Sequence, residues 1–150
     1  MSFKQIIGQE KPVNILQNAI RNNRLAHAYL FEGPPSVGKV FTVLNFIKAI
    51  NCLSRLESGS DCCDQCASCK KIDSKNHIDI TWIGLLKGKS QISIDEIRQM
   101  QGQINLKPYE AKYKVFCITD AELMNQEAQS ALLKTLEEPP LKSIIILTTS

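Results

Sequence analysis

The chain has 150 residues, a length that suits one domain of ordinary size, and 43% of them are apolar, which is enough for a buried core. Its formal net charge of +3 is too small to indicate a dedicated nucleic-acid-binding protein. The sequence shows no secretory signal, and no apolar run approaches the roughly 18 residues that span a membrane. We therefore expect a cytoplasmic protein without a membrane partner.

Apolar residues recur along the chain at helical and strand spacings in turn. The expected elements are helix 8–25, strand 26–33, helix 39–52, strand 79–85, helix 93–106, strand 114–121, helix 125–140 and strand 143–149. Ser93 and Glu96 form a plausible capping box, Asn125 can cap the last helix, and Pro139 stops it. Strands that alternate with helices predict an α/β fold with a parallel sheet covered by helices on both faces.

The stretch "GPPSVGKV" lies between a predicted strand and a predicted helix, which is the context of a phosphate-binding loop. The candidate cofactor-binding residues are Gly33, Pro34, Pro35, Ser36, Val37, Gly38, Lys39 and Val40. In such a loop the glycines let backbone N–H groups close around phosphates, and the following helix adds its own free amides. The lysine would then reach the outer phosphates of a nucleotide.

The loop departs from the pattern G-x-x-x-x-G-K-[ST] at its last position. Val40 stands where a Ser or Thr hydroxyl would coordinate magnesium, and we expect it on the apolar face of the second helix. Ser36 replaces a glycine that is common in such loops, and its side chain adds strain if the position needs a positive φ. We therefore expect weak binding of ATP or ADP, or none.

The end of the third predicted strand gives a second test of nucleotide chemistry. A hydrolase of this kind ends that strand with an Asp that helps to hold magnesium, often followed by a Glu that activates water. Here Thr119 takes the Asp position and Asp120 takes the Glu position. A slipped register, in which Asp120 serves as the metal ligand, is the alternative. Two defects at magnesium-handling positions argue against hydrolysis, so we assign no catalytic residue.

Five of the six cysteines gather in a polar segment at about residues 52–76. Cys63, Cys66 and Cys69 follow one another at two-residue gaps, and Cys52 lies eleven positions before Cys63. In a reducing compartment this spacing predicts a closed, structural Zn²⁺ site with four thiolate ligands. Cys62 is the alternative to Cys63 as a ligand.

The order of these motifs resembles the clamp-loader branch of the AAA+ proteins over nearly the whole chain. The similarity is carried by "IIGQE", "RLAHAYLFEGPPSVGK", the four-cysteine insert, "ISIDEIRQMQ", "KVFCITDAELMNQEAQSALLKTLEEPP" and "IIILTTS". It implies a RecA/AAA+-like P-loop core in which residues 1–150 form one nucleotide-binding-like domain with a zinc insert. It also implies that the chain stops before the lid and collar domains of the family.

Within that branch the chain looks most like the delta-prime subunits of bacterial DNA polymerase III. The resemblance implies a non-hydrolysing structural subunit that helps to load the sliding clamp on primed DNA, with gamma/tau and delta subunits as partners. An active ATPase of the gamma/tau type is the first alternative. The others are a metal-stapled interaction module that ignores nucleotide, and a DNA-binding surface on residues 1–50, which carry six Lys or Arg and two Asp or Glu.

Overall fold

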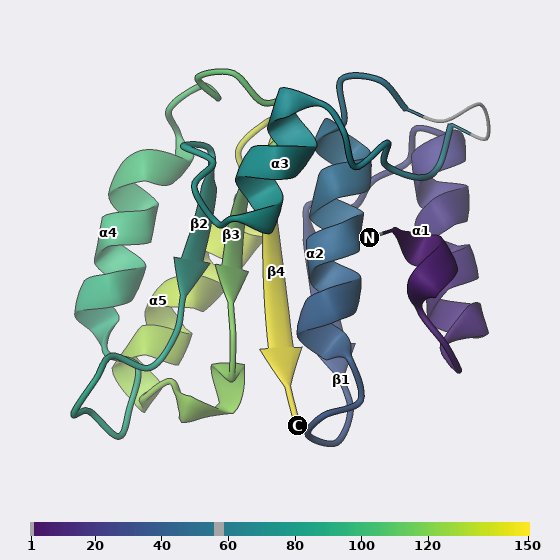
Figure 1. Ribbon diagram of the computed structural model, residues 1–150. Helices are drawn as coiled ribbons and strands as arrows, with labels where there is room; N and C mark the ends of the chain where they lie inside the picture. The colour runs from purple at the N-terminus through teal and green to yellow at the C-terminus, as the bar shows by residue number, and fades with distance from the viewer. Residues whose placement is uncertain (1, 56–58) are drawn as a thin grey trace.

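The computed structural model describes residues 2–55 and 59–150 and consists of one sheet flanked by helices (Figure 1). In chain order its elements are η1 (Phe3–Gln5), α1 (Glu10–Arg21), β1 (Ala28–Glu32), α2 (Lys39–Asn51), α3 (Ala67–Asp73), β2 (Ile80–Ile83), α4 (Ile94–Ile104), β3 (Lys114–Ile118), η2 (Ala121–Leu123), α5 (Gln126–Glu137) and β4 (Ser143–Thr149), where η marks a short 3-10 helix. Every helix and strand that the sequence predicts is present. Helix α3, within the cysteine segment, was not predicted.

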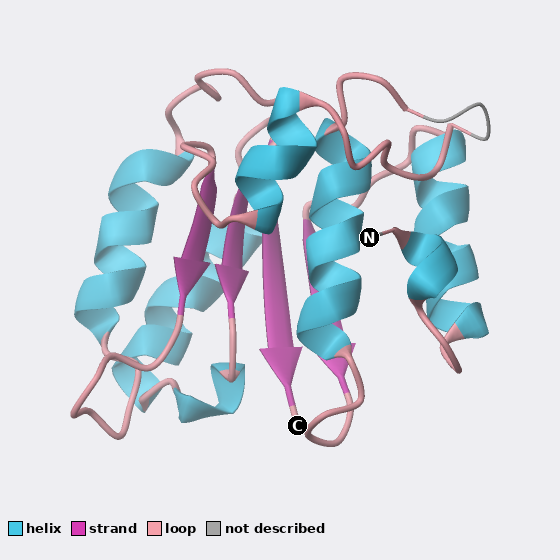
Figure 2. Ribbon diagram, in the orientation of Figure 1, coloured by secondary structure: helices cyan, strands magenta, loops and turns pink. Residues whose placement is uncertain are grey.

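The four strands are parallel and lie in the order β1-β4-β3-β2. Successive side chains of β3 point to opposite faces of the sheet, as the pleat requires. Val115 and Cys117 face one hydrophobic core, while Phe116 and Ile118 face the other. Figure 2 shows helices on both sides of the strands, which confirms the predicted α/β architecture.

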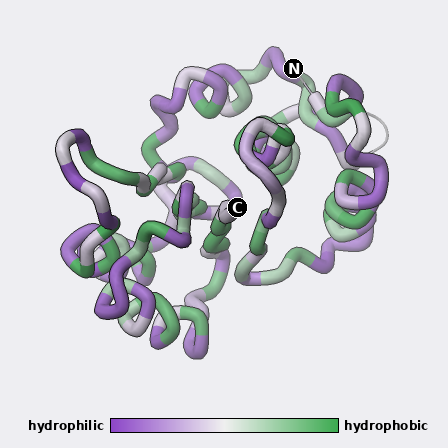
Figure 3. Tube along the Cα trace, turned by 90° about the horizontal axis from the view of Figure 1, so that it is seen from below, coloured by the Kyte–Doolittle hydropathy of each residue, from purple (hydrophilic) through white to green (hydrophobic). Residues whose placement is uncertain are grey.

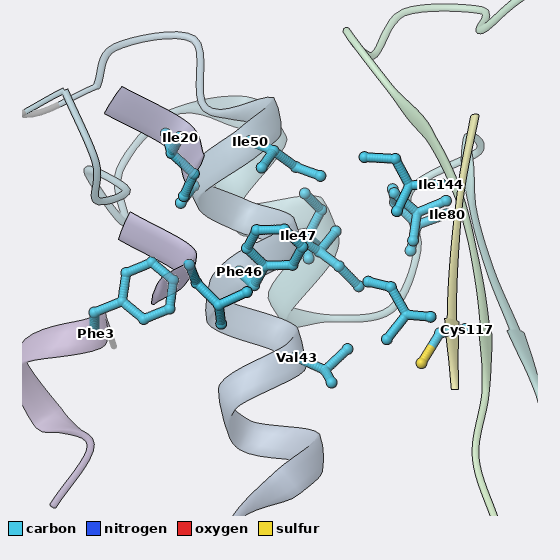
Figure 4. Close-up of a cluster of buried hydrophobic side chains, with 14 of the residues drawn as sticks. Phe3, Ile20, Val43, Phe46, Ile47, Ile50, Ile80, Cys117 and Ile144 are labelled. Carbon is cyan, nitrogen blue, oxygen red and sulfur yellow. The ribbon is translucent and has the colours of Figure 1, made fainter. Parts of the chain in front are cut away.

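The first core lies between the sheet and helices α1 and α2. Phe46 and Ile50 of α2 are fully buried there, and the Tyr29 ring meets the Phe46 ring edge-on with centroids 5.0 Å apart. Phe3 from the N-terminal η1 closes the outer side of this cluster (Figure 4). Helix α2 is thus packed on several sides, and its position relative to the sheet is fixed by close packing.

The second core lies under α4 and α5, on the other face of the sheet. The Ser93 and Glu96 capping box begins α4, and the Asn125 side chain accepts the Ala128 amide at 2.9 Å to begin α5, as predicted. The Gln101 amide group joins the two helices by donating to the Ala131 carbonyl at 2.8 Å. These contacts set the two helices in register against the sheet.

Asp79, just before β2, anchors the loop that leads into β3. Its carboxylate is 2% exposed and accepts the backbone amides of Tyr109, Glu110 and Ala111 at 2.7, 2.8 and 2.8 Å. Burial alone would raise the pKa of Asp79, but these three amides favour the charged form and hold its pKa below the ordinary value. The carboxylate thus fixes where the central strand begins.

We predict that Asp79→Asn destabilises the fold by about 2–3 kcal/mol, because the uncharged Asn side chain has one acceptor oxygen and cannot pair with all three backbone amides that Asp79 accepts. Urea unfolding measures this loss, and Glu137→Gln, the same chemical change at an exposed site, is the control. A lowered folded-state pKa stabilises the protein above the unfolded value of about 3.9, and this contribution is lost as the pH falls through the folded pKa. The difference between wild type and Asp79→Asn should therefore shrink below about pH 4. A pH-independent difference would contradict this.

Candidate functional site

The phosphate loop lies at the edge where the parallel strands end, the usual ligand-binding edge of such sheets. The Gly33 amide donates to the Thr149 carbonyl at 3.2 Å, which ties the loop to the end of β4. The Asp120 amide donates to the Thr148 hydroxyl at 3.2 Å, which ties the end of β3 to β4. The C-terminus lies beside this loop in Figure 1 and near the middle of this edge in Figure 3.

The loop has the backbone shape that its glycines predict. Gly38 precedes α2 with a φ of +92°, and the helix start receives no side-chain cap there, so its first amides are open to an anion. Ser36 has a φ of 65°, in the left-handed region. Ser36 was expected to add strain if its position needs a positive φ, and it does have one. Its side chain therefore adds backbone strain that glycine would not.

Lys39 turns back over the loop. Its ammonium group donates to the Gly33 carbonyl and lies 3.4 Å from the Pro34 carbonyl. The lysine therefore stands over the space that phosphates would enter, held by carbonyl oxygens of the loop itself. A phosphate that binds there must exchange these carbonyl contacts for its own.

A cleft of about 510 Å³ opens beside the loop, between α1, β1 and the start of α2. Ile15 and Leu30 give it an apolar wall, and Gly38 and Lys39 line its polar end. Its volume lies within the range of small-molecule sites, and an apolar wall with a phosphate-binding end suits a nucleotide.

The two positions that are expected to handle magnesium carry Val40 and Thr119. Val40 is 40% exposed and does not join the core, contrary to the expectation that it lies on the buried face of its helix. The Thr119 hydroxyl follows β3 and donates to the Ile83 carbonyl at 3.3 Å, so it is engaged with the neighbouring strand. Asp120 is exposed and turns into η2 with a φ of 56°.

Glu122 is a carboxylate at this edge that the sequence analysis did not single out. It accepts the Ser150 hydroxyl at 2.9 Å. Its pKa is lowered by its own backbone amide and, among smaller causes, by the positive charge of Lys39. The only sequence signal for it is its place two residues after Asp120, which a motif built on the strand end does not include.

The four predicted cysteines come together at the far end of α2. The sulfur atoms of Cys52, Cys63, Cys66 and Cys69 all lie within 4.8 Å of one another, and those of Cys52 and Cys66 are 3.9 Å apart. Four thiolates at about 2.3 Å from a tetrahedral zinc ion stand about 3.8 Å from one another. The donor set therefore fits a metal ion of this kind.

Backbone amides point at these sulfurs. The amides of Cys63, Cys66 and Cys69 donate to the sulfurs of Cys52, Cys63 and Cys66 at 3.4, 3.3 and 3.4 Å. Burial acts to raise the pKa of Cys66, but amide hydrogen bonds lower that pKa to about 6. Burial raises the pKa of Cys52 to about 12. A bound metal would deprotonate both thiols, since only thiolates are strong ligands.

Cys62 is buried but turned differently. Its sulfur lies 3.4 Å from a carboxylate oxygen of Asp64, and it is not among the four clustered ligand atoms. The geometry thus favours Cys63 over Cys62.

In the part of the chain that the structure describes, no helix is both long and apolar enough to cross a membrane.

Comparisons with known proteins find subunits of DNA polymerase III. A family model described as "DNA polymerase III, delta subunit" matches residues 8–150. Subunit tau of DNA polymerase III from Bacillus subtilis is 37% identical over 148 residues, which are 99% of this chain and 25% of that protein. The delta' subunit from the same organism is 35% identical over 144 residues, or 94% of this chain and 41% of that protein.

The fold has a counterpart among solved structures. A DNA polymerase III gamma-subunit-related protein from Thermotoga maritima matches with a TM-score of 0.56 and 21% identity, over 89% of this chain and 38% of that one. At this identity the match concerns the fold alone. The chain spans between about a quarter and two fifths of the length of these relatives. Because the family model covers nearly all of it, the chain belongs to the family of DNA polymerase III clamp-loader subunits.

Proposed function

We propose that residues 1–150 form the AAA+ nucleotide-binding-like domain of a clamp-loader subunit of the delta-prime type, one that does not hydrolyse ATP. The observation that carries this proposal is Val40, at the position where a hydroxyl would coordinate magnesium. Its partners would be gamma/tau and delta subunits, with the sliding clamp and primed DNA reached through the complex. The subunit would act by holding its place in the assembly.

Magnesium demands near-octahedral oxygen ligands and loses water reluctantly, so each protein ligand matters. Val40 offers two methyl groups, and the hydroxyl of Thr119 is engaged with the Ile83 carbonyl. A hydroxyl is also a much weaker magnesium ligand than a carboxylate. The slipped alternative, with Asp120 as the ligand, has an exposed carboxylate in a left-handed turn after the strand. Phosphates could still meet the open amides of α2 and Lys39, so weak binding without metal is the expected remnant.

The alternative function is an active ATPase of the gamma/tau type. It is favoured by the tau and gamma relatives, such as the tau/gamma subunit of Haemophilus influenzae, which is 34% identical over 139 residues. The intact glycines, Lys39 and the cleft beside them also suit it. We prefer the delta-prime type because both defects fall on magnesium-handling positions, whereas the retained residues serve the shape of the loop.

We also propose that Cys52, Cys63, Cys66 and Cys69 hold one structural Zn²⁺ ion, in an insert at about residues 52–76. The support is their mutual distance and the amides that face their sulfurs. When bound, the ion would crosslink a polar segment that has few apolar side chains to bury. A closed four-ligand site leaves no open position for catalysis.

We predict that the double variant Val40→Thr/Thr119→Asp gains magnesium-dependent ATP binding. Magnesium should raise its ATP affinity by about tenfold or more, equivalent to about 1.4 kcal/mol, because both missing oxygen ligands are restored. Calorimetric titration with and without magnesium measures this. The reverse-charge control Val40→Thr/Thr119→Lys should show no gain, and a double variant indifferent to magnesium would contradict our interpretation of these positions.

ATP hydrolysis separates the two candidate functions. We expect phosphate release by the wild-type chain with saturating ATP and magnesium to match that of Lys39→Ala, because no bound metal supports transfer to water. A rate clearly above the Lys39→Ala control would favour the gamma/tau alternative.

We predict that the purified chain binds one equivalent of zinc and that Cys63→Ser weakens this binding by more than about tenfold. Cys62→Ser makes the same chemical change one residue away and should leave the affinity unchanged. Competition with a metal-binding dye gives both affinities. The opposite result, with zinc lost only in Cys62→Ser, would replace Cys63 by Cys62 in the ligand set.

A further inference from the structure

Lys48 is a charged side chain that is fully buried. It lies on α2 next to the fully buried Ile47 and Ala49, and its own exposure is 0%. Burying an ammonium group costs several kcal/mol unless opposite charges and hydrogen bonds offset the loss of water. The groups that contact Lys48 therefore indicate why a lysine stands there.

Among the residues that the structure describes, two carboxylates from the cysteine segment contact Lys48. The ammonium nitrogen lies 2.9 and 3.1 Å from the two oxygens of Asp73, and it also contacts Asp64. Asp64 lies in the turn between Cys63 and Cys66, whereas Asp73 is the last residue of α3. One buried cation thus bridges the two parts of the segment that carry ligands.

Asp64 connects this bridge to the sulfur atoms. Its backbone has a φ of 61°, which makes the tight turn between Cys63 and Cys66. Its carboxylate faces Lys48, while the turn itself brings the sulfurs of Cys63 and Cys66 into the cluster. A shift of the Asp64 side chain would therefore open the turn that carries two of the four sulfurs.

Asp73 holds the other half of the ligand set. Helix α3 contains Cys69, and its N-terminus is capped by the sulfur of Cys66. Ile72 is fully buried against the first core, but it is the sole large apolar residue of this seven-residue helix. With so little apolar surface, α3 depends on Asp73 to keep its end against α2.

We propose that Lys48 is a positioning residue of the four-cysteine metal site. Its ammonium fixes the Cys63–Cys66 turn and helix α3 at one separation, so that their three sulfurs meet Cys52 at the end of α2. The attraction is strengthened because four thiolates around a divalent ion carry a net negative charge, and a buried cation feels it with little screening by water. This inference rests on the proposed zinc site.

The test is the zinc affinity of Lys48→Met, which keeps the length of the side chain and removes its charge. We expect the affinity, measured by competition with a metal-binding dye, to fall about tenfold, as when an outer partner of a ligand is removed. Lys71→Met is the matched control, because Lys71 lies on α3, the helix of Cys69 and Asp73, but pairs with Glu110 at 2.8 Å on the surface. Its zinc affinity should not change.

A purely structural role for Lys48 would give a different result. Urea unfolding compares Lys48→Met with wild type, once with zinc bound and once after chelator treatment. If Lys48 positions the ligands, the variant should lose more unfolding free energy in the zinc-bound state. Equal losses in both states, with unchanged zinc affinity, would overturn the proposal. If wild type binds no zinc, the proposed zinc site is wrong. If wild type and Lys48→Met bind zinc equally well, the zinc site stands and the proposed role of Lys48 is wrong.

Asp64→Asn keeps the test valid if Lys48→Met does not fold. It removes the charge that faces Lys48 and keeps a side chain of the same size, and the Cys62 thiol that also contacts this carboxylate is not among the clustered sulfurs. The expected result is again a loss of zinc affinity, and in a foldable double variant with Lys48→Met the two losses should not add, because both changes break the Lys48–Asp64 contact. Unchanged zinc affinity in Asp64→Asn would overturn the proposal.

Discussion

The burial of helix α2 is the constraint on which both candidate sites depend. The helix runs from the phosphate loop at Lys39 to the residue before Cys52, and its side chains pack against α1, α3 and the sheet. Because Phe46 and Ile50 are fully buried, the helix cannot shift without opening the core. Its two ends are thereby fixed: one presents free amides to the cleft, and the other presents a sulfur to the cysteine cluster.

This arrangement explains how the loop can keep its form without a hydroxyl at residue 40. The loop is shaped by the positive φ of Gly38 and by the packing of the helix that follows, and neither needs magnesium. Val40 is partly exposed and belongs to neither core, so packing does not require a valine there. Its lack of an oxygen therefore bears on function more than on folding, and it accords with the engaged hydroxyl of Thr119.

The sequence was most informative where a repeated pattern carries the structure. Apolar spacing predicted the strands and the long helices. The two-residue gaps between Cys63, Cys66 and Cys69 predicted the four-cysteine cluster. Helix α3 was not predicted because Ile72 is its single large apolar residue, and one residue cannot show a helical period. Spacing already favoured Cys63 over Cys62, and the sulfur of Cys63 is the one that lies in the cluster.

Long-range polar contacts were the other part that the sequence could not supply. Lys48 meets Asp73, which lies 25 residues away, and Asp79 meets a loop about 30 residues away. A lysine on a helix is normally expected on the solvated face, and only the fold shows that this one is buried. Such pairs depend on which elements the topology brings together, so local propensity does not predict them.

Calorimetric titration of the purified wild-type chain with ATP, in the presence and absence of Mg²⁺, tests the central claim most directly. Weak binding that is indifferent to magnesium, or no binding, is the predicted result, since the loop retains amides and Lys39 but no metal ligand at Val40. Tight binding that depends on magnesium would contradict the account and would indicate an active nucleotide site.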